Sequence, residues 1–94
     1  MKTWNDYKEY VKNNDPEIKK DVEEIEDISA MMSIVISQRK ALGFSQRALA
    51  TMCDIPQSSV ARMETLKTIP TLSTFVKILR NLNLKLNISS SKLA

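Results

Sequence analysis

The side chains that most enzymes use are scarce in this chain of 94 residues. It contains no His, a single Cys and a single Gly. Without His there is no Ser/His or Cys/His pair for nucleophilic catalysis, and one Gly cannot form a glycine-rich phosphate loop. The missing His also leaves no zinc site, and Cys53 is expected to be a small buried apolar residue. The sequence therefore predicts a protein that is not an enzyme and has no metal, cofactor or small-molecule ligand.

The polar residues that could do chemistry are those of a recognition surface. In the stretch from Pro56 to Glu64, Val60 and Met63 are spaced to face inwards along a helix. Gln, Ser and Arg side chains have donors and acceptors that match base edges and phosphates in a DNA major groove. The outward side chains of this stretch are the candidates for reading DNA bases: Gln57, Ser58, Ser59 and Arg62.

Two short helices joined by a tight turn must position this surface. Ser45 is a suitable N-cap for the first helix. Leu49, Ala50, Met52 and Cys53 form its apolar stripe. Asp54 tolerates the left-handed backbone that a sharp turn needs, and Pro56 suits the first position of a second helix.

Three further helices and one strand are expected around this pair. The first helix runs from Thr3 to about residue 13, and the second from about 16 to 42, with a break near 27–29 as an open alternative. Near its end, Gln38, Arg39 and Lys40 are placed to meet a nucleic-acid backbone. A helix over about 72–81 has a predicted buried stripe: Leu72, Phe75, Val76, Leu79 and Leu82.

Residues 82–88 alternate apolar and polar side chains at every position, which is typical of a half-buried strand. One strand alone is not stable, so the simplest partner is the same strand of a second copy. An irregular tail lying on the core is the alternative. The candidates for this dimer contact are Leu84, Leu86 and Ile88.

The charges are distributed unevenly. Residues 1–27 contain five Lys and nine acids, whereas residues 28–94 contain nine basic residues and only Asp54 and Glu64 as acids. A basic domain with an acidic head is typical of a nucleic-acid binder with a second partner, although charge runs can also be simple solvated helix faces. No apolar run is long enough to span a membrane and no secretory signal is present, so the cytoplasm of a bacterium is expected.

The stretch SQRALATMCDIPQSSVARME resembles the helix-turn-helix of the Cro/C1-type (XRE) repressor family. The small Ala50 and the apolar Cys53, Ile55 and Val60 fit the family's buried positions, whereas Asp54 replaces the usual Gly. The stretch from Thr71 to Ile88 and the upstream DPEI helix look similar to HigA-type antitoxins. The resemblance implies an all-α fold: a five-helix domain with an N-terminal helical extension and a short C-terminal β-strand. The expected divisions are a head at 1–27, a DNA-binding domain at 28–88 and a flexible tail at 89–94.

The resemblance also implies roles for particular residues. Arg62 stands where the family reads bases, and Gln46 where it commonly holds a phosphate; Glu64 matches a structural position. Arg47, Lys67 and Thr68 are further phosphate candidates. The partners implied are double-stranded operator DNA, a second copy, and a toxin that is a basic mRNA-cleaving ribonuclease. The candidates for toxin binding are Trp4, Tyr7, Tyr10 and Ile18.

The favoured hypothesis is a repressor that is also the antitoxin of a type II toxin–antitoxin pair and regulates its own operon. A phage- or plasmid-type repressor without a toxin is one alternative, with residues 1–27 only bracing the dimer. Another is a protein-interaction module that no longer binds DNA, because Arg62 is the only basic residue of the second short helix.

Overall fold

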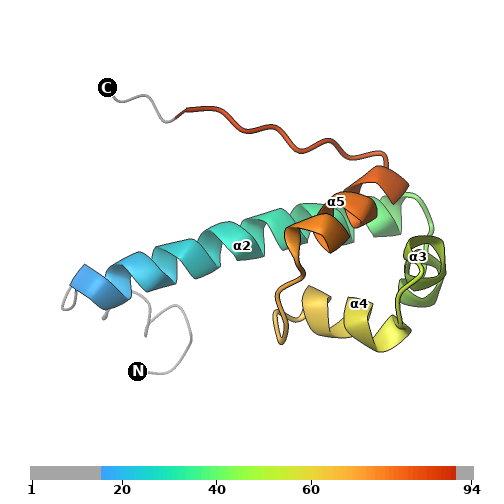
Figure 1. The fold of residues 1–94 in the computed structure, drawn as a ribbon, viewed down its shortest axis with the longest axis horizontal. Coiled ribbons are helices and arrows are strands. Elements are labelled where there is room, and N and C mark those ends of the chain that lie inside the picture. The colour runs from blue at the N-terminus through green and yellow to red at the C-terminus, as the bar shows by residue number, and fades with distance from the viewer. Residues whose placement is uncertain (1–15, 91–94) are drawn as a thin grey trace. The chain divides into compact units, whose positions relative to one another are not determined.

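The computed structural model describes residues 16–90, which form four helices (Figure 1). In chain order these are α2 (Pro16–Ala41), α3 (Gln46–Cys53), α4 (Gln57–Glu64) and α5 (Leu72–Asn81). Their bounds agree with the predicted ranges to within one residue. The expected first helix, and with it Trp4, Tyr7 and Tyr10, lies outside the described residues, so the predicted count of five helices is not supported.

Helix α2 is continuous from Pro16 to Ala41, without the break considered near 27–29. No Gly or Pro interrupts it after Pro16, so its hydrogen-bond ladder can continue. The chain divides into two compact units, residues 1–33 and 34–94, so α2 contributes to both. In the first unit, the described part is acidic, with Ile18 and Ile25 among its exposed apolar side chains.

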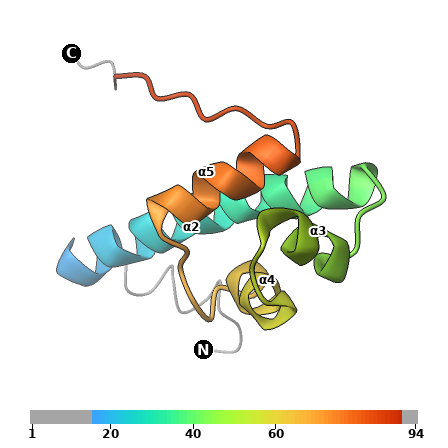
Figure 2. The same cartoon turned by 45° about the vertical axis from the view of Figure 1, so that its right-hand side comes forward.

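The second unit has a small core between its helices. Helix α3 packs against both α4 and α5 (Figure 2). The Gln38 Nε2 atom donates a hydrogen bond of 2.9 Å to the Leu82 carbonyl, which ties α2 to the end of α5. The buried apolar side chains of this unit are Val35, Leu49, Ala50, Cys53, Val60, Met63, Ile78, Leu79 and Leu82.

The buried face of α5 differs from the predicted one. Ile78 is fully buried, whereas Leu72 and Val76 are 70% and 36% exposed. In α3, Met52 is likewise exposed, at 38%. The apolar residues of α5 occupy a wider arc than one buried face, so helical periodicity alone could not select the side that faces α3. The prediction for Leu72 and Val76 was wrong.

The C-terminal segment is not a strand within the described residues, contrary to prediction. Leu82 is fully buried, Asn83 has the left-handed φ of 58°, and the Leu84 amide donates to the Leu79 carbonyl over 2.8 Å. These features cap α5 rather than begin a strand. After Leu84 the chain is extended and irregular, and the side chain of Ile88 is 89% exposed. An isolated chain offers these residues no strand to pair with.

Among residues 16–90, no helix is long and apolar enough to cross a bilayer.

Candidate nucleic-acid interface

The turn between α3 and α4 is built from local signals. Ser45 caps α3, because its hydroxyl accepts a hydrogen bond of 3.0 Å from the Ala48 amide. Asp54 ends α3 in the left-handed conformation, with φ 56° and ψ 47°, and the Ile55 amide donates to the Ala50 carbonyl. Both features agree with the sequence-based expectation, and together they redirect the chain into α4.

Helix α4 begins one residue later than predicted. Pro56 is its N-cap, with φ −63° and ψ 146°, and makes no side-chain capping bond. Val60 and Met63 are buried as expected, which orients the opposite side of α4 outwards. On that side Gln57, Ser58 and Arg62 are exposed, and the small Ala61 between them is half-buried. Three of the four predicted base-reading residues are therefore together on one accessible face.

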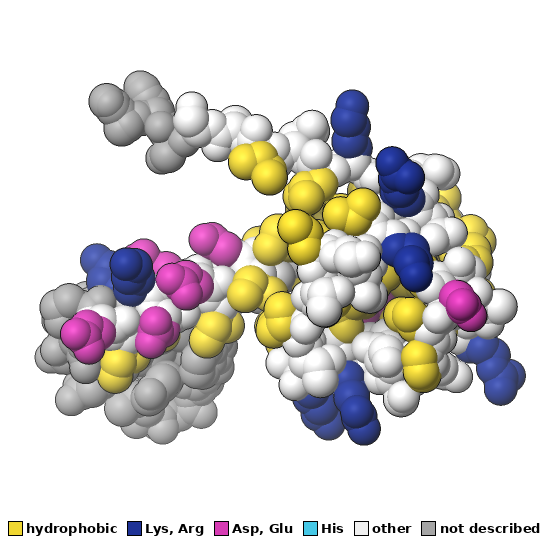
Figure 3. All heavy atoms as spheres, viewed as in Figure 1, with side chains coloured by type: hydrophobic (Ala, Val, Ile, Leu, Met, Phe, Trp, Pro, Cys, Tyr) yellow, Lys and Arg dark blue, Asp and Glu magenta, His cyan; other side chains and the backbone are white. Residues whose placement is uncertain are grey.

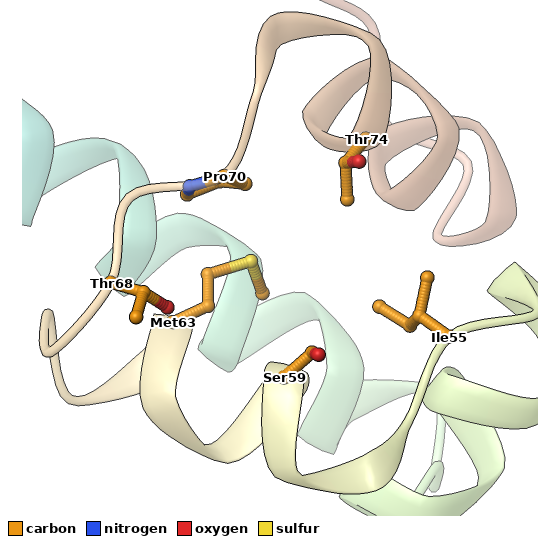
Figure 4. Close-up of a pocket in the computed structure, with 6 residues that line it drawn as sticks. All are labelled: Ile55, Ser59, Met63, Thr68, Pro70 and Thr74. Atoms are coloured by element: carbon orange, nitrogen blue, oxygen red, sulfur yellow. The ribbon is translucent and has the colours of Figure 1, made fainter.

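Ser59 does not share that face. Its side chain is half-buried and lines a pocket of about 200 Å³ between α4 and α5 (Figure 4). In Figure 4 the Ser59 hydroxyl points into the space that Ile55 and Thr74 also face. Because Ser59 is one helical turn before the buried Met63, it is aligned with the inner side of α4. The other lining residues are Met63, Thr68 and Pro70.

A buried ion pair fixes the far end of α4. The guanidinium of Arg39 donates to both carboxylate oxygens of Glu64: Nε to Oε2 over 2.7 Å and Nη2 to Oε1 over 3.0 Å. The exposed fractions of the two side chains are only 9% and 5%. The remaining Arg39 Nη1 donates to the Phe44 carbonyl over 2.8 Å. This bidentate geometry joins α2, the turn after it and α4.

Gln46 joins this network from the first residue of α3. Its Nε2 atom donates to Glu64 Oε1 over 2.9 Å. One Nε2 hydrogen is therefore committed to holding α3 against α4, and the amide retains a second donor. The expected structural role of Glu64 is seen here in its hydrogen bonds with the side chains of Arg39 and Gln46.

The expectation that Arg39 meets a nucleic-acid backbone was wrong, and its structural role was not predicted. It is buried and paired, so it does not meet a nucleic-acid backbone; Gln38 also turns inwards, to Leu82. A signal was present in the sequence, because Arg39 continues the inward spacing of Met32 and Val35. A buried Arg requires an acid, and residues 28–94 contain only Asp54 and Glu64.

The other phosphate candidates lie at the edges of the helix pair. Arg47 is exposed in the first turn of α3, and Lys67 and Thr68 are exposed just after α4. The amides of Lys67 and Thr68 donate to the Arg62 carbonyl over 2.8 and 3.4 Å, so this loop is folded back onto the end of α4. Lys67 and Thr68 therefore lie next to the end of α4 that carries Arg62.

The unit that carries this face has a positive net charge. Described residues 34–90 contain eight basic and two acidic residues, a net charge of +6, and one of the two acids, Glu64, is already paired. Figure 3 shows Lys and Arg side chains over the helices of this unit and acidic side chains on the N-terminal half of α2. A positive, mostly polar surface attracts a polyanion.

Cys53 lies on the inner side of the site. It is fully buried, and Asn81 Nδ2 donates to its Sγ atom over 3.5 Å. Burial raises the pKa of the thiol, and the hydrogen bond from Asn81 and the charge of Lys77 oppose this only in part. Within residues 16–90 no group of His, Cys, Asp and Glu side chains could hold a metal ion.

Comparison with known proteins points in one direction. Residues 35–88 match the family described as Helix-turn-helix. The chain is also 31% identical over 85 residues to a protein of Haemophilus influenzae named an uncharacterized HTH-type transcriptional regulator. That alignment covers 90% of this chain and 82% of the relative. No solved structure matches the chain.

Proposed function

This chain belongs to the helix-turn-helix family, and on that premise we propose that it is a sequence-specific DNA-binding repressor of transcription. The observation that carries the proposal is the outer face of α4, where Gln57, Ser58 and Arg62 are exposed on a helix of a strongly basic unit. The name of the relative from H. influenzae supports a role in transcription.

In the proposed complex α4 enters the major groove. Arg62 forms a bidentate contact with guanine, worth about 1–3 kcal/mol of discrimination, and Gln57 reads adenine. Arg47, Lys67 and Thr68 contact phosphates, and Gln46 uses its second Nε2 hydrogen for the same purpose. Ser59 is left out of the base-reading set, because its side chain faces the pocket between α4 and α5.

The repressor acts as a homodimer in this proposal. Two copies place their α4 helices on half-sites about one helical turn of DNA apart. The segment from Leu84 to Ile88 supports this, because Leu86 and Ile88 are exposed and the chain there is extended. Pairing with the same segment of a second copy would satisfy the backbone groups of both and cover these side chains.

The test begins with selection of duplex DNA from a random pool by the full-length protein, since the operator must first be found. We expect Arg62→Ala to lose preference at one base pair, at a cost of about 1–3 kcal/mol. Lys67→Ala should weaken binding evenly on all sequences and reduce the log–log salt slope by about one. Binding that selects no sequence, or an Arg62→Ala loss that is equal on every duplex, would contradict the proposal.

A second role is favoured by the separation of charge along the chain. Described residues 17–27 have six acids and two Lys, next to a unit of charge +6. An acidic head suits a basic partner, so we propose that residues 1–27 bind and neutralise a toxin that is a basic ribonuclease. Its anchors are Ile18, which is 37% exposed, and the aromatic residues of the head: Trp4, Tyr7 and Tyr10.

Purification of the tagged full-length protein from its host at low salt tests this role. The expected partner is a basic protein that cleaves mRNA in vitro and is inhibited by addition of the antitoxin. The variant Trp4→Ser/Tyr7→Ser should fail to capture it while retaining DNA binding. If the wild type and the Trp4→Ser/Tyr7→Ser variant both capture DNA alone, the repressor without a toxin is favoured.

A further inference from the structure

One exposed face of α5 combines apolar and basic side chains. Leu72, Val76 and Arg80 follow one another at one-turn spacing, and Lys77 adjoins them. Leu72 and Val76 are 70% and 36% exposed, and neither Lys77 nor Arg80 forms an ion pair with a described residue. These four residues, named the α5 face, form an apolar strip edged by positive charge that the described chain leaves partly uncovered.

A nucleic acid is a poor occupant of the α5 face. DNA interfaces are polar and wet, and phosphates would leave Leu72 and Val76 without apolar contacts. Protein interfaces, by contrast, cover apolar side chains at their centre and place charges around the rim. The α5 face therefore fits an amphipathic segment with apolar side chains along one line and acids beside them.

The N-terminal half of α2 has that pattern. Asp21, Glu24, Ile25 and Ile28 occupy positions i, i+3, i+4 and i+7 and so share one side of the helix. Asp21 and Glu24 are exposed, Ile25 is 44% exposed and Ile28 is half-buried. Two apolar and two acidic side chains thus match the two apolar and two basic side chains of the α5 face in type and number.

We propose that residues 21–28 of α2 dock on the α5 face of a second copy of this chain. Each copy supplies both surfaces, so the contact is made twice around a two-fold axis and closes as a dimer. The argument for a second copy is charge complementarity: residues 17–27 have a net charge of −4 and residues 34–90 a net charge of +6. This contact is separate from the pairing of residues 84–88 in the proposed homodimer, and its test contains neither DNA nor a toxin.

Charge reversal of the full-length protein tests the contact. Sedimentation equilibrium at 50 mM NaCl would give the dimer dissociation constant for Lys77→Glu/Arg80→Glu and for Asp21→Lys/Glu24→Lys. Each double variant should weaken self-association by about tenfold or more, because four exposed ion pairs of the symmetric dimer become repulsions. An equimolar mixture of the two variants should dimerise as tightly as the wild type, since each variant supplies what the other has lost.

A matched control separates the contact from net charge. Lys40→Glu reverses an exposed charge in the last turn of α2, as Arg80→Glu does in the last turn of α5, so both incur the same penalty from the helix dipole. Only Arg80→Glu should weaken the dimer. Equal dissociation constants for Lys40→Glu and Arg80→Glu, or a mixture of double variants that dimerises no better than its components, would overturn the proposal.

A spin label locates the contact independently of its strength. A nitroxide on Glu23→Cys, in a Cys53→Ala background, is mixed with ¹⁵N-labelled wild-type protein. The NMR signals of the amides of residues 72–80 in the ¹⁵N-labelled copy should broaden selectively. A dimeric sample without broadening in α5 would also overturn the proposal, whatever the charge variants show.

Discussion

The buried ion pair between Arg39 and Glu64 leads to the sharpest prediction about stability. Glu64→Gln keeps the size of the side chain but removes its charge. In the wild type, the two carboxylate oxygens accept from Arg39 Nε and Nη2 and from Gln46 Nε2. A Gln side chain has one acceptor oxygen and one NH₂ group, which would face these donors. The substitution leaves the guanidinium of Arg39, at 9% exposure, without a counter-charge.

The expected cost follows from this burial. Removing one partner of a buried pair typically costs about 3–5 kcal/mol. We expect the lower value, about 3 kcal/mol, because Gln still accepts one of the hydrogen bonds. For a domain of this size, about 1 kcal/mol lowers Tm by 4–8 °C, so Tm should fall by about 12–24 °C.

Urea and thermal unfolding of the full-length protein at pH 7, at one fixed protein concentration, measure this loss. Fixed concentration matters because a dimer's apparent stability depends on it. Asp54→Asn is the matched control: it makes the same change of acid to amide on an exposed side chain, and Asn tolerates the left-handed backbone. It should change the free energy of unfolding by less than about 0.5 kcal/mol.

The single variants Arg39→Gln and Glu64→Gln and the double variant Arg39→Gln/Glu64→Gln form a double-mutant cycle. Once Arg39 is neutral, Glu64→Gln no longer strands a buried charge, so the double variant should be less destabilised than the sum of the two single variants. A loss below about 1 kcal/mol for Glu64→Gln, or additivity of the two changes within about 0.5 kcal/mol, would refute the reasoning.

Three further predictions concern single residues. Leu49→Ala removes a fully buried side chain and should cost about 2–5 kcal/mol in urea unfolding, whereas Met52→Ala on the exposed side of α3 should cost much less. Gly43→Ala should cost about 1 kcal/mol from backbone strain alone, because Gly43 has a φ of 79° and an added Cβ meets no atom within 4 Å; no change in the free energy of unfolding would contradict this. Burial raises the pKa of the Cys53 thiol in the folded state. The contribution of this thiol to the free energy of unfolding is therefore complete below the ordinary pKa of 9.0 and is lost as pH rises above that value. The stability of the wild type relative to Cys53→Ala should therefore fall between pH 8 and pH 10, and a difference that is constant with pH would exclude this.

Local signals in the sequence determined the helices and the turn. Ser45 and Thr71 cap α3 and α5 through their hydroxyls, and Gly43 and Asp54 adopt the left-handed conformation that ends α2 and α3. Each of these features depends on residues within about one helical turn, so the order of residue types was sufficient to predict it. The same holds for Val60 and Met63, whose inward spacing leaves Gln57, Ser58 and Arg62 outside.

Only the tertiary structure decided which of several similar faces is used. The wide apolar arc of α5 could have been buried on the side of Leu72, but the fold buries Ile78 instead. Arg39 and Glu64 are 25 positions apart, and Ser59 faces a pocket because α5 lies across from it. The tail after Leu84 lacks a strand in the isolated chain because its pairing requires a neighbour. Periodicity gives the direction of a side chain relative to its own helix, but burial depends on what the remaining chain places opposite that side chain.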